Sequence, residues 1–411
     1  KYTPEKPKRC TFVMSKAKFD YFRYLIDPMP AHVEGPVYEK WKDKPEGYDQ
    51  NTLYTKDPKN TGLYNGPYVV SEIKLGSHVI FVANKNFRGK QPFFQKVIFK
   101  LIPNNGVLAA NLQSGNIDMI ASAAGLGPDQ ALAFDRKVKA EKLPYQVLFE
   151  DGTIYAHIDL NLDHPALSDI RVRRALAHSF SREEITKSLL EGRAKVALHN
   201  ITPKDAWYTE KVPVYKYDRK EANRLLDEAG WKMGAKGYRE KDGKRLTFTI
   251  MAAAGAKINE IIQTYLQSQF KAVGIELFIK NEPARVFFGE TTTRRKFDMA
   301  LYSWVSTPEN SPRSTLHSTS IPTAANSWSG QNFPGYNNPE MDKLIDSLEL
   351  ELSAKKRAEI AKKIVELYAR DVFVLPVYFR QNNVVIPAGM KNFRLIGHQF
   401  YETLYIENWA M

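Results

Sequence analysis

Hydrophobic and polar positions follow two different periods along this chain, and the two patterns succeed one another from end to end. Apolar residues on every second position predict strands, at 68–73, 79–83, 97–102, 246–251, 275–279 and 297–304. Apolar residues three and four apart predict helices, at 107–114, 128–140, 168–180, 258–270 and 353–367. Strands and helices that alternate in this way favour an α/β fold.

Several predicted helices begin at a residue that can cap them. Ser181 with Glu184 forms the capping-box pattern, and Asp218 begins a similar one. Asn338 and Ser353 are predicted caps of the last two helices, because their side chains can accept hydrogen bonds from the first turn.

Two segments stand apart from this regular alternation. Residues 305–333 form a long polar stretch rich in Ser, Thr, Pro and Asn, and loops of this length are usually functional or mobile. Residues 372–386 are apolar and predict a strand region, which we expect Pro376 to interrupt.

Composition limits the class of protein. The 411 residues predict two or three domains, and 43% hydrophobic with 26% charged residues excludes a disordered chain. No apolar run reaches the 18 residues that a spanning helix needs. The net charge of +13 is spread over small basic groups, which favours a solvated basic surface and predicts no nucleic-acid partner. The single cysteine, Cys10, forbids an internal disulfide and is predicted to be a buried thiol.

The chain lacks the common motifs of catalysis. It has no Gly-x4-Gly-Lys phosphate loop, no His-Glu-x-x-His helix and no Gly-x-Ser-x-Gly element. The sequence therefore predicts no cofactor, no metal site and no catalytic residues, although a triad assembled in space remains open. Aromatic residues make up 12%, and their apolar faces and polar tips suit reversible capture of amphipathic ligands.

A set of longer motifs resembles one known family. "NGPYVVSEI", followed by "VIFVANKNFRGKQPFFQKVIFKLIPNNGVLAANLQSGNIDMI", is similar to dipeptide and oligopeptide substrate-binding proteins of ABC importers, the family 5 extracellular solute-binding proteins. "HIDLNLDHPALSDIRVRRALAHSFSREEITKSLLEGRAKVA" looks like the family's most recognisable segment. "YKYDRKEANRLLDEAGW", "FDMALYSW" and "VFVLPVYFRQNNVVIP" follow in the family's order, so the resemblance covers roughly residues 60 to 390.

The resemblance implies a two-lobed periplasmic-binding-protein-like (type II) fold. Lobe I would hold residues 61–150 and 376–411, and lobe II residues 151–375, with crossings near 149–151 and 374–376. Residues 1–60 would be a remnant of the small extra domain and a linker. Compared with the family, the chain lacks a signal peptide, part of the first lobe and most of the extra domain, so we expect a fragment, a processed chain or a protein whose start is carried elsewhere.

The resemblance also implies a ligand site. Trp304 would be an aromatic platform, with Ser306 and Thr307 as polar contacts and Glu309 or Arg313 as the charged anchor. Further ligand-binding candidates lie near the two expected crossings: His157, Asn161, Tyr378 and Arg380. In peptide-binding members an Asp three positions after the Trp pairs with the ligand's α-ammonium group, whereas this chain has Thr307 there, and Leu301 stands where some members have an Arg.

The implied function is an extracytoplasmic receptor, not an enzyme, in the periplasm or at the outer face of the cytoplasmic membrane. We expect it to be a monomer that captures a peptide between two hinged lobes and delivers it to ABC transporter permease subunits. Two alternatives stay open: the same role for a non-peptide small molecule, such as an oligosaccharide or an opine-like compound, and a hydrolase on the same scaffold.

Overall fold

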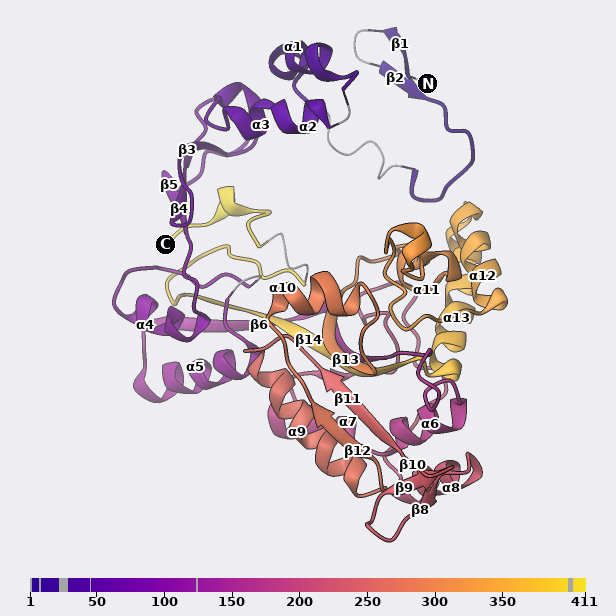
Figure 1. Cartoon of the computed structure of the whole chain (residues 1–411). Coiled ribbons are helices and arrows are strands. Elements are labelled where there is room, and N and C mark those ends of the chain that lie inside the picture. The colour runs from indigo at the N-terminus through magenta and orange to yellow at the C-terminus, as the bar shows by residue number, and fades with distance from the viewer. Residues whose placement is uncertain (1, 7–8, 22–28, 45, 123–124, 398–401) are drawn as a thin grey trace. The chain divides into compact units, whose positions relative to one another are not determined.

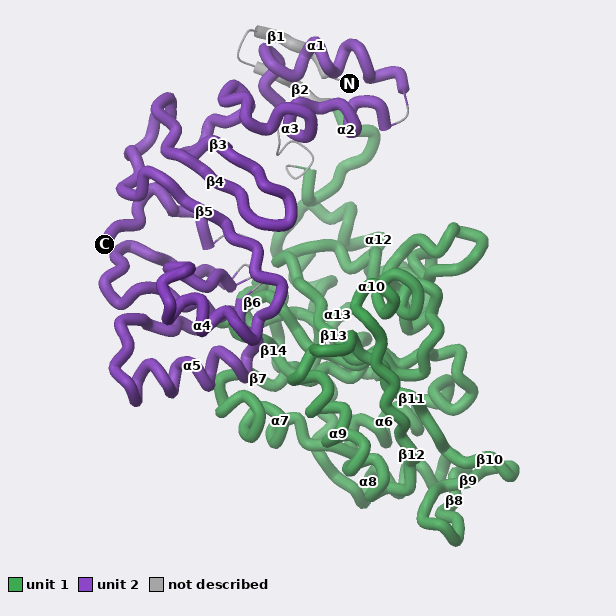
Figure 2. The backbone as a smooth tube through the Cα atoms, turned by 60° about the vertical axis from the view of Figure 1, so that its left-hand side comes forward, with its two compact units in different colours: residues 1–21, 151–381 green, residues 22–150, 382–411 purple. Residues whose placement is uncertain are grey.

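The structure is a computed structural model that describes residues 2–6, 9–21, 29–44, 46–122, 125–397 and 402–411. The chain divides into two compact units (Figure 2). Unit 1 holds residues 1–21 and 151–381, and unit 2 holds residues 22–150 and 382–411. The chain therefore passes between the units at 21/22, at 150/151 and at 381/382. Residues 1–21 group with unit 1 and residues 22–60 with unit 2, whereas the sequence predicted that 1–60 are a remnant of the small extra domain and a linker.

Unit 1 is built on a six-stranded mixed sheet with the order β12-β11-β13-β6-β14-β7 (Figure 1). β11 is parallel to both β12 and β13, and β13 is antiparallel to β6. The strands are β6 (Tyr145–Leu160), β7 (Lys195–Val196), β11 (Thr247–Met251), β12 (Glu276–Ile279), β13 (Met299–Val305) and β14 (Val374–Pro387). A small side sheet contains β8 (Lys232–Met233), β9 (Arg239–Lys241) and β10 (Lys244–Arg245).

Helices cover the central sheet and confirm the α/β prediction. They are α6 (Ile170–His178), α7 (Arg182–Leu189), α8 (Arg219–Glu228), α9 (Lys257–Lys271), α10 (Ala284–Val286), the π-helical turn η4 (Phe287–Thr292), α11 (Arg313–Leu316), η5 (Ser318–Ser320), η6 (Ala324–Asn326), α12 (Pro339–Leu350) and α13 (Ala354–Asp371). The main core lies between the sheet and α6, α7, α8 and α9, and Leu176, Phe248, Phe270 and Met299 are completely buried there.

Unit 2 contains a three-stranded antiparallel sheet and several short helices. Its elements are α1 (Ala31–Trp41), α2 (Gly47–Asn51), α3 (Leu53–Lys56), η2 (Thr61–Leu63), β3 (Tyr68–Lys74), β4 (His78–Ala83), β5 (Lys96–Lys100), η3 (Asn105–Val107), α4 (Leu108–Gln113), α5 (Pro128–Glu141) and η7 (Ile406–Asn408). The unit has its own core around Leu112, Phe134 and Val385. The N-terminal hairpin, β1 (Tyr2–Lys6) with β2 (Arg9–Phe12), is grouped with unit 1, and the surroundings of the Cys10 side chain in β2 lie outside the described residues.

The predicted caps are confirmed. The Ser181 hydroxyl accepts a hydrogen bond from the Glu184 N–H, and Asp218 accepts two N–H bonds at the start of α8. Asn338 and Ser353 cap α12 and α13 in the same manner.

The sequence was wrong about Pro376, because β14 runs through it without a break. β7 pairs with β14 only through Tyr378 and Phe379, so no strand on that side requires an N–H from residue 376. The carbonyl of Pro376 accepts a hydrogen bond from Arg182 instead.

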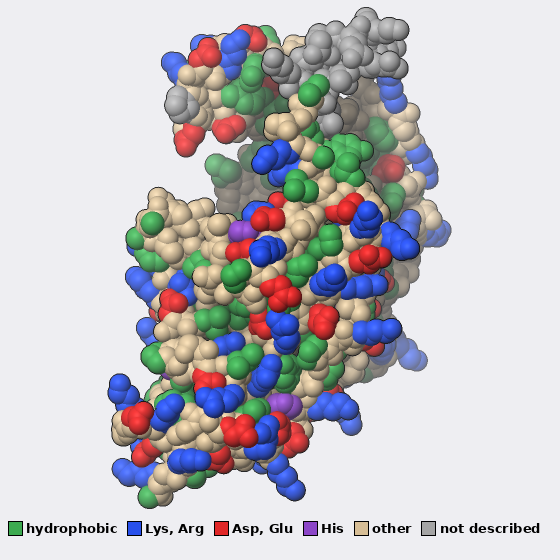
Figure 3. Space-filling view, turned by 90° about the vertical axis from the view of Figure 1, so that its right-hand side faces the viewer, with side chains coloured by type: hydrophobic (Ala, Val, Ile, Leu, Met, Phe, Trp, Pro, Cys, Tyr) green, Lys and Arg blue, Asp and Glu red, His purple; other side chains and the backbone are tan. Residues whose placement is uncertain are grey.

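Figure 3 shows how charged side chains are distributed on one face of the protein. On the face drawn in Figure 3, Lys and Arg side chains are interspersed with Asp and Glu side chains. None of the helices in the described residues combines the length and the apolarity needed to cross a bilayer.

Candidate ligand-binding site

Trp304 lies near the end of β13, where it pairs with Tyr155 of β6. Its ring stacks on Phe333, with centroids 6.1 Å apart and planes 20° apart, and it meets the edge of Tyr302 at 5.6 Å. The side chain is only partly buried, so part of the indole remains open to solvent. An aromatic ring held by two others and still partly exposed can serve as a rigid platform for a ligand.

Ser306 and Thr307 continue the chain beyond Trp304. The Ser306 N–H donates to the Thr153 carbonyl over 2.6 Å, which extends the pairing of β13 with β6 by one residue. Ser306 is half-buried and Thr307 is exposed. The structure therefore brings these two candidates together with Trp304.

Glu309 follows in a left-handed backbone conformation, with φ at 50°. Its N–H donates to Asp205 Oδ2 over 2.8 Å, so the buried Asp205 carboxylate fixes this strained turn. The Glu309 carboxylate lies 3.9 Å from Arg357 and is 44% exposed, which leaves it available to a ligand cation.

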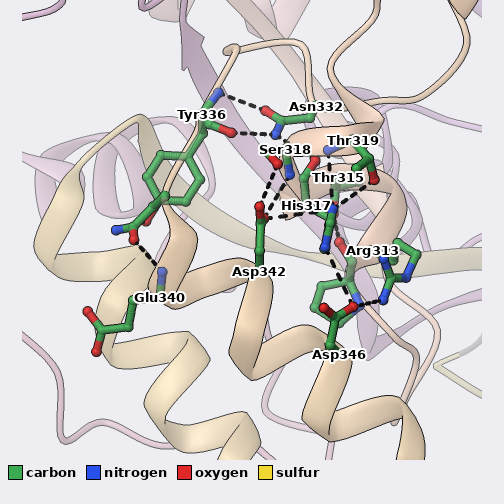
Figure 4. Close-up of polar contacts among 12 residues, drawn as sticks. Arg313, Thr315, His317, Ser318, Thr319, Asn332, Tyr336, Glu340, Asp342 and Asp346 are labelled. Carbon is green, nitrogen blue, oxygen red and sulfur yellow. Dashed lines mark hydrogen bonds and ion pairs between the residues drawn. The ribbon is translucent and has the colours of Figure 1, made fainter.

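Arg313 is directed toward α12 (Figure 4). Its Nε donates to Glu349 over 2.9 Å, and its Nη2 pairs with Asp346. The hydrogen bond from Arg313 to Glu349 raises the pKa of the guanidinium group. A ligand carboxylate would have to compete with both of these side chains for that group.

The segment after Trp304 is more ordered than its composition indicates. It contains α11, η5 and η6 and is bound to α12 by several polar contacts, which Figure 4 shows. Asp342 accepts hydrogen bonds from both the N–H and the hydroxyl of Ser318. The buried Asn332 side chain bonds His317 O and both backbone polar groups of Tyr336. Side-chain hydrogen bonds, including those to α12, therefore hold this segment in place, although it has little regular secondary structure.

The same cluster contains Ser318, His317 and Asp342, the residue types of a hydrolytic triad. Asp342 binds the Ser318 hydroxyl directly and lies 3.8 Å from His317 Nδ1. In the described structure the His317 ring does not accept a hydrogen bond from Ser318, and Thr319 binds Nδ1 instead. Ser318 therefore lacks the bond to His317 that a Ser-His-Asp triad needs, and the hydroxyl on His317 Nδ1 is that of Thr319.

His157 is completely buried, stacked on Tyr155 at 4.6 Å and against the edge of Tyr302 at 4.4 Å. Its Nε2 lies 3.5 Å from Asp159 Oδ1, and Tyr302 donates its O–H to Asp159 Oδ2 over 2.5 Å. Burial lowers the pKa of His157 to about 3 and raises the pKa of Asp159 to about 7. His157 thus supports the site from beneath Tyr302 and is not itself exposed to a ligand.

Asn161 lies at the opposite end of β13 from Trp304. Leu160 pairs with Met299, whereas Tyr155 pairs with Trp304, so about 17 Å of strand separates the two ends. The Asn161 amide donates to Arg295 O and Phe297 O, which fixes the entry into β13. The structure does not bring Asn161 next to the platform.

Tyr378 and Arg380 belong to unit 1, the unit that also holds Trp304. The sequence assigned them to the other lobe, but β14 stays in the sheet of unit 1 through its pairing with β7. Tyr378 is 2% exposed and contributes to the main core. Arg380 is half-buried, and its Nε is a buried donor without a hydrogen-bond partner among the described residues.

Sequence reasoning missed the aromatic residues that hold Trp304. Tyr302 could have been found, since period two places it on the same face of β13 as Trp304. Phe333 and Asp205 come from distant parts of the chain and leave no local signal. Within the described residues, no three His, Cys, Asp or Glu side chains are grouped so that they could hold a metal ion.

Known proteins share this architecture. A sequence profile described as bacterial extracellular solute-binding proteins, family 5, middle, matches residues 3–327. The oligopeptide-binding protein AppA of Bacillus subtilis (strain 168) is 26% identical over 409 residues, which cover 97% of this chain and 70% of the relative. The structure of AppA in complex with a nonapeptide superposes with a TM-score of 0.78 at 23% identity, over 100% of this chain and 77% of that one.

Two further structures are similar. The oligopeptide-binding protein of Thermus thermophilus, complexed with a pentapeptide, has a TM-score of 0.72 and 26% identity, covering 92% of this chain and 70% of that one. NikZ of Campylobacter jejuni, in complex with Ni(L-His), has a TM-score of 0.82 and 25% identity, covering 100% of this chain and 78% of that one. Their shared fold is the periplasmic-binding-protein fold that the sequence motifs indicated.

Proposed function

The chain belongs to the bacterial extracellular solute-binding proteins of family 5, and on this basis we propose that it is a receptor that captures a peptide and passes it to the permease of an ABC importer. Members of this family are solute-binding receptors rather than enzymes, and they work outside the cytoplasmic membrane. The relatives that bind a nonapeptide and a pentapeptide support a peptide as the ligand.

The observation that carries the proposal is the partly exposed Trp304 at the end of β13. Its ring is fixed by Phe333 and Tyr302, and the polar residues Ser306 and Thr307 follow it directly. A peptide backbone laid beside Ser306 would find hydroxyl groups to bond, and a ligand group could lie on the open part of the indole. Glu309 takes the place of the missing carboxylate at position 307 and pairs with the ligand's α-ammonium group.

The ligand would be released unchanged, as expected of a solute-binding receptor, and the Ser318 hydroxyl binds Asp342 rather than His317. Ligand binding would favour a closed arrangement of the two units, and the closed form would be the one that meets the permease subunits. We expect a monomer in solution with the mass of a single chain, 47.0 kDa.

Isothermal titration with synthetic peptides of five and nine residues tests this function. The wild-type protein should bind at one peptide per chain. Trp304→Ala should weaken binding by about 30-fold or more, the effect of removing a central aromatic contact. Trp328→Ala is the matched control, because Trp328 is also half-buried in unit 1 but contacts Arg294 instead. Absence of peptide binding to the wild-type protein, or equal losses in both variants, would contradict the proposal.

A further inference from the structure

A second exposed aromatic side chain lies close to Trp304. Phe288, on the π-helical turn η4, is 46% exposed. Its ring meets Tyr302 edge to face, with centroids 5.9 Å apart and planes 82° apart. Tyr302 is also the ring that touches Trp304, so two partly exposed aromatic rings flank one buried tyrosine. Single exposed apolar residues are common on proteins, but two partly exposed rings that touch the same buried tyrosine, one of them in the candidate site, point to a shared contact surface.

Phe288 is held firmly by its neighbours. Phe287 is completely buried and packs against both Phe288 and Tyr302. The hydroxyl groups of Thr292 and Thr293 donate to the Phe288 carbonyl over 3.2 and 2.7 Å. A ring fixed in this way loses little conformational freedom when a ligand packs on it. π-helical turns also occur frequently at functional sites.

Tyr302 joins the two rings and is 3% exposed. Its hydroxyl donates a hydrogen bond to Asp159 over 2.5 Å and also hydrogen-bonds the Trp304 side chain, so it is not available to a ligand. What Tyr302 can offer on the ligand side is its ring. Aromatic rings attract other aromatic groups in edge-to-face and offset-stacked geometry, and they also bury aliphatic groups.

We infer that Phe288 and Trp304 form the two walls of an apolar subsite, with Tyr302 as its floor, which selects ligands that carry a large apolar side chain, preferably aromatic. The inference rests on the proposed function and deepens it, because it names the peptides that the receptor prefers. Phe288 is then a specificity-determining residue, since it contacts one side chain of the ligand and not the peptide backbone.

The test uses pentaalanine and the five pentapeptides in which one Ala is replaced by Phe. The wild-type protein should bind one of the five about 10-fold more tightly than pentaalanine, the gain expected from burying a phenyl ring in place of a methyl group. In Phe288→Ala this preference should fall below about 3-fold, while the affinity for pentaalanine stays within about 3-fold of wild type. Phe288→Leu should keep part of the preference, because it retains an apolar wall.

Phe278→Ala provides the control. Phe278 is 53% exposed on β12 of the same unit and is therefore a comparable surface truncation. Both the preference for Phe and the affinity for pentaalanine should remain at wild-type values in Phe278→Ala. Circular dichroism checks that the Phe288 and Phe278 variants all fold.

The outcomes separate the two proposals. If the wild-type protein binds none of the six peptides, the peptide function itself is contradicted. If it binds them without a preference for Phe, or if Phe288→Ala keeps the preference, the subsite is contradicted while the receptor function stands. Equal losses for pentaalanine and the preferred peptide would also overturn the inference, because Phe288 would then act on folding or on the backbone contact.

Discussion

Replacing Asp159 by Asn should change how the stability of the protein depends on pH. Asp159 is 3% exposed on β6, between the Tyr302 hydroxyl and the His157 ring. Burial raises the pKa of Asp159 from 3.8 to about 7, so the folded protein holds this carboxyl protonated under mildly acidic conditions. A protonated Asp159 can also donate to His157 Nε2, which otherwise has no hydrogen-bond partner among the described residues.

The sign of the effect follows from linkage. Because the folded pKa of Asp159 lies above the unfolded value, its contribution to stability is fully present below about pH 4 and is lost as the pH rises through about 7. His157 acts in the opposite direction, since burial lowers its pKa from 6.5 to about 3 and its contribution is lost as the pH falls below 6.5. In the wild-type protein the two effects offset each other between about pH 4 and pH 6.5.

The Asn variant keeps only the histidine effect. Relative to wild type, its free energy of unfolding should rise by about 1.4 kcal/mol per pH unit between pH 4 and pH 7, about 4 kcal/mol in all. Urea unfolding of both proteins, followed by tryptophan fluorescence from pH 4 to pH 8.5, measures this difference. A difference for Asp159→Asn that does not depend on pH would refute the reasoning.

Two other substitutions test how the elements around the site are held. Asp218→Ala should lower the free energy of unfolding in urea by about 1 kcal/mol, because Asp218 accepts hydrogen bonds from the Lys220 and Glu221 N–H groups at the start of α8. Asp218→Asn should restore most of this loss. An Asp218→Ala variant as stable as wild type would contradict the cap. Asn332→Ala should lower the free energy of unfolding by about 2 kcal/mol or more and increase proteolysis within residues 306–338, because the completely buried Asn332 amide makes three hydrogen bonds there. Unchanged proteolysis would show that contacts with α12 hold this segment without Asn332.

Local features were predictable from the sequence, because their physical causes lie within a few residues of one another. Ser181 and Asp218 were identified as caps from spacing alone, and α5 follows the predicted helix that begins at Pro128. The sequence also predicted a strand that ends at Trp304, and β13 ends one residue later, at Val305.

Features that depend on distant partners were not predictable. Arg313 looked like a free cation in the sequence, and only the fold shows that Asp346 and Glu349 approach it. Tyr378 looked like a residue beyond the second crossing, and only the fold shows that β14 lies between β6 and β7 and that Tyr378 packs in the main core of unit 1. The order of residues 306–338 likewise depends on carboxylates of α12 that are remote in the chain.

Mass spectrometry of small molecules released from the purified, exported protein tests the central claim most directly. The account predicts intact peptides at about one per chain, carrying a large apolar side chain, and little or no peptide on Trp304→Ala prepared in the same way. Recovery of cleaved products, or the same released molecules from both proteins, would contradict a receptor that holds its ligand at Trp304 and gives it up unaltered.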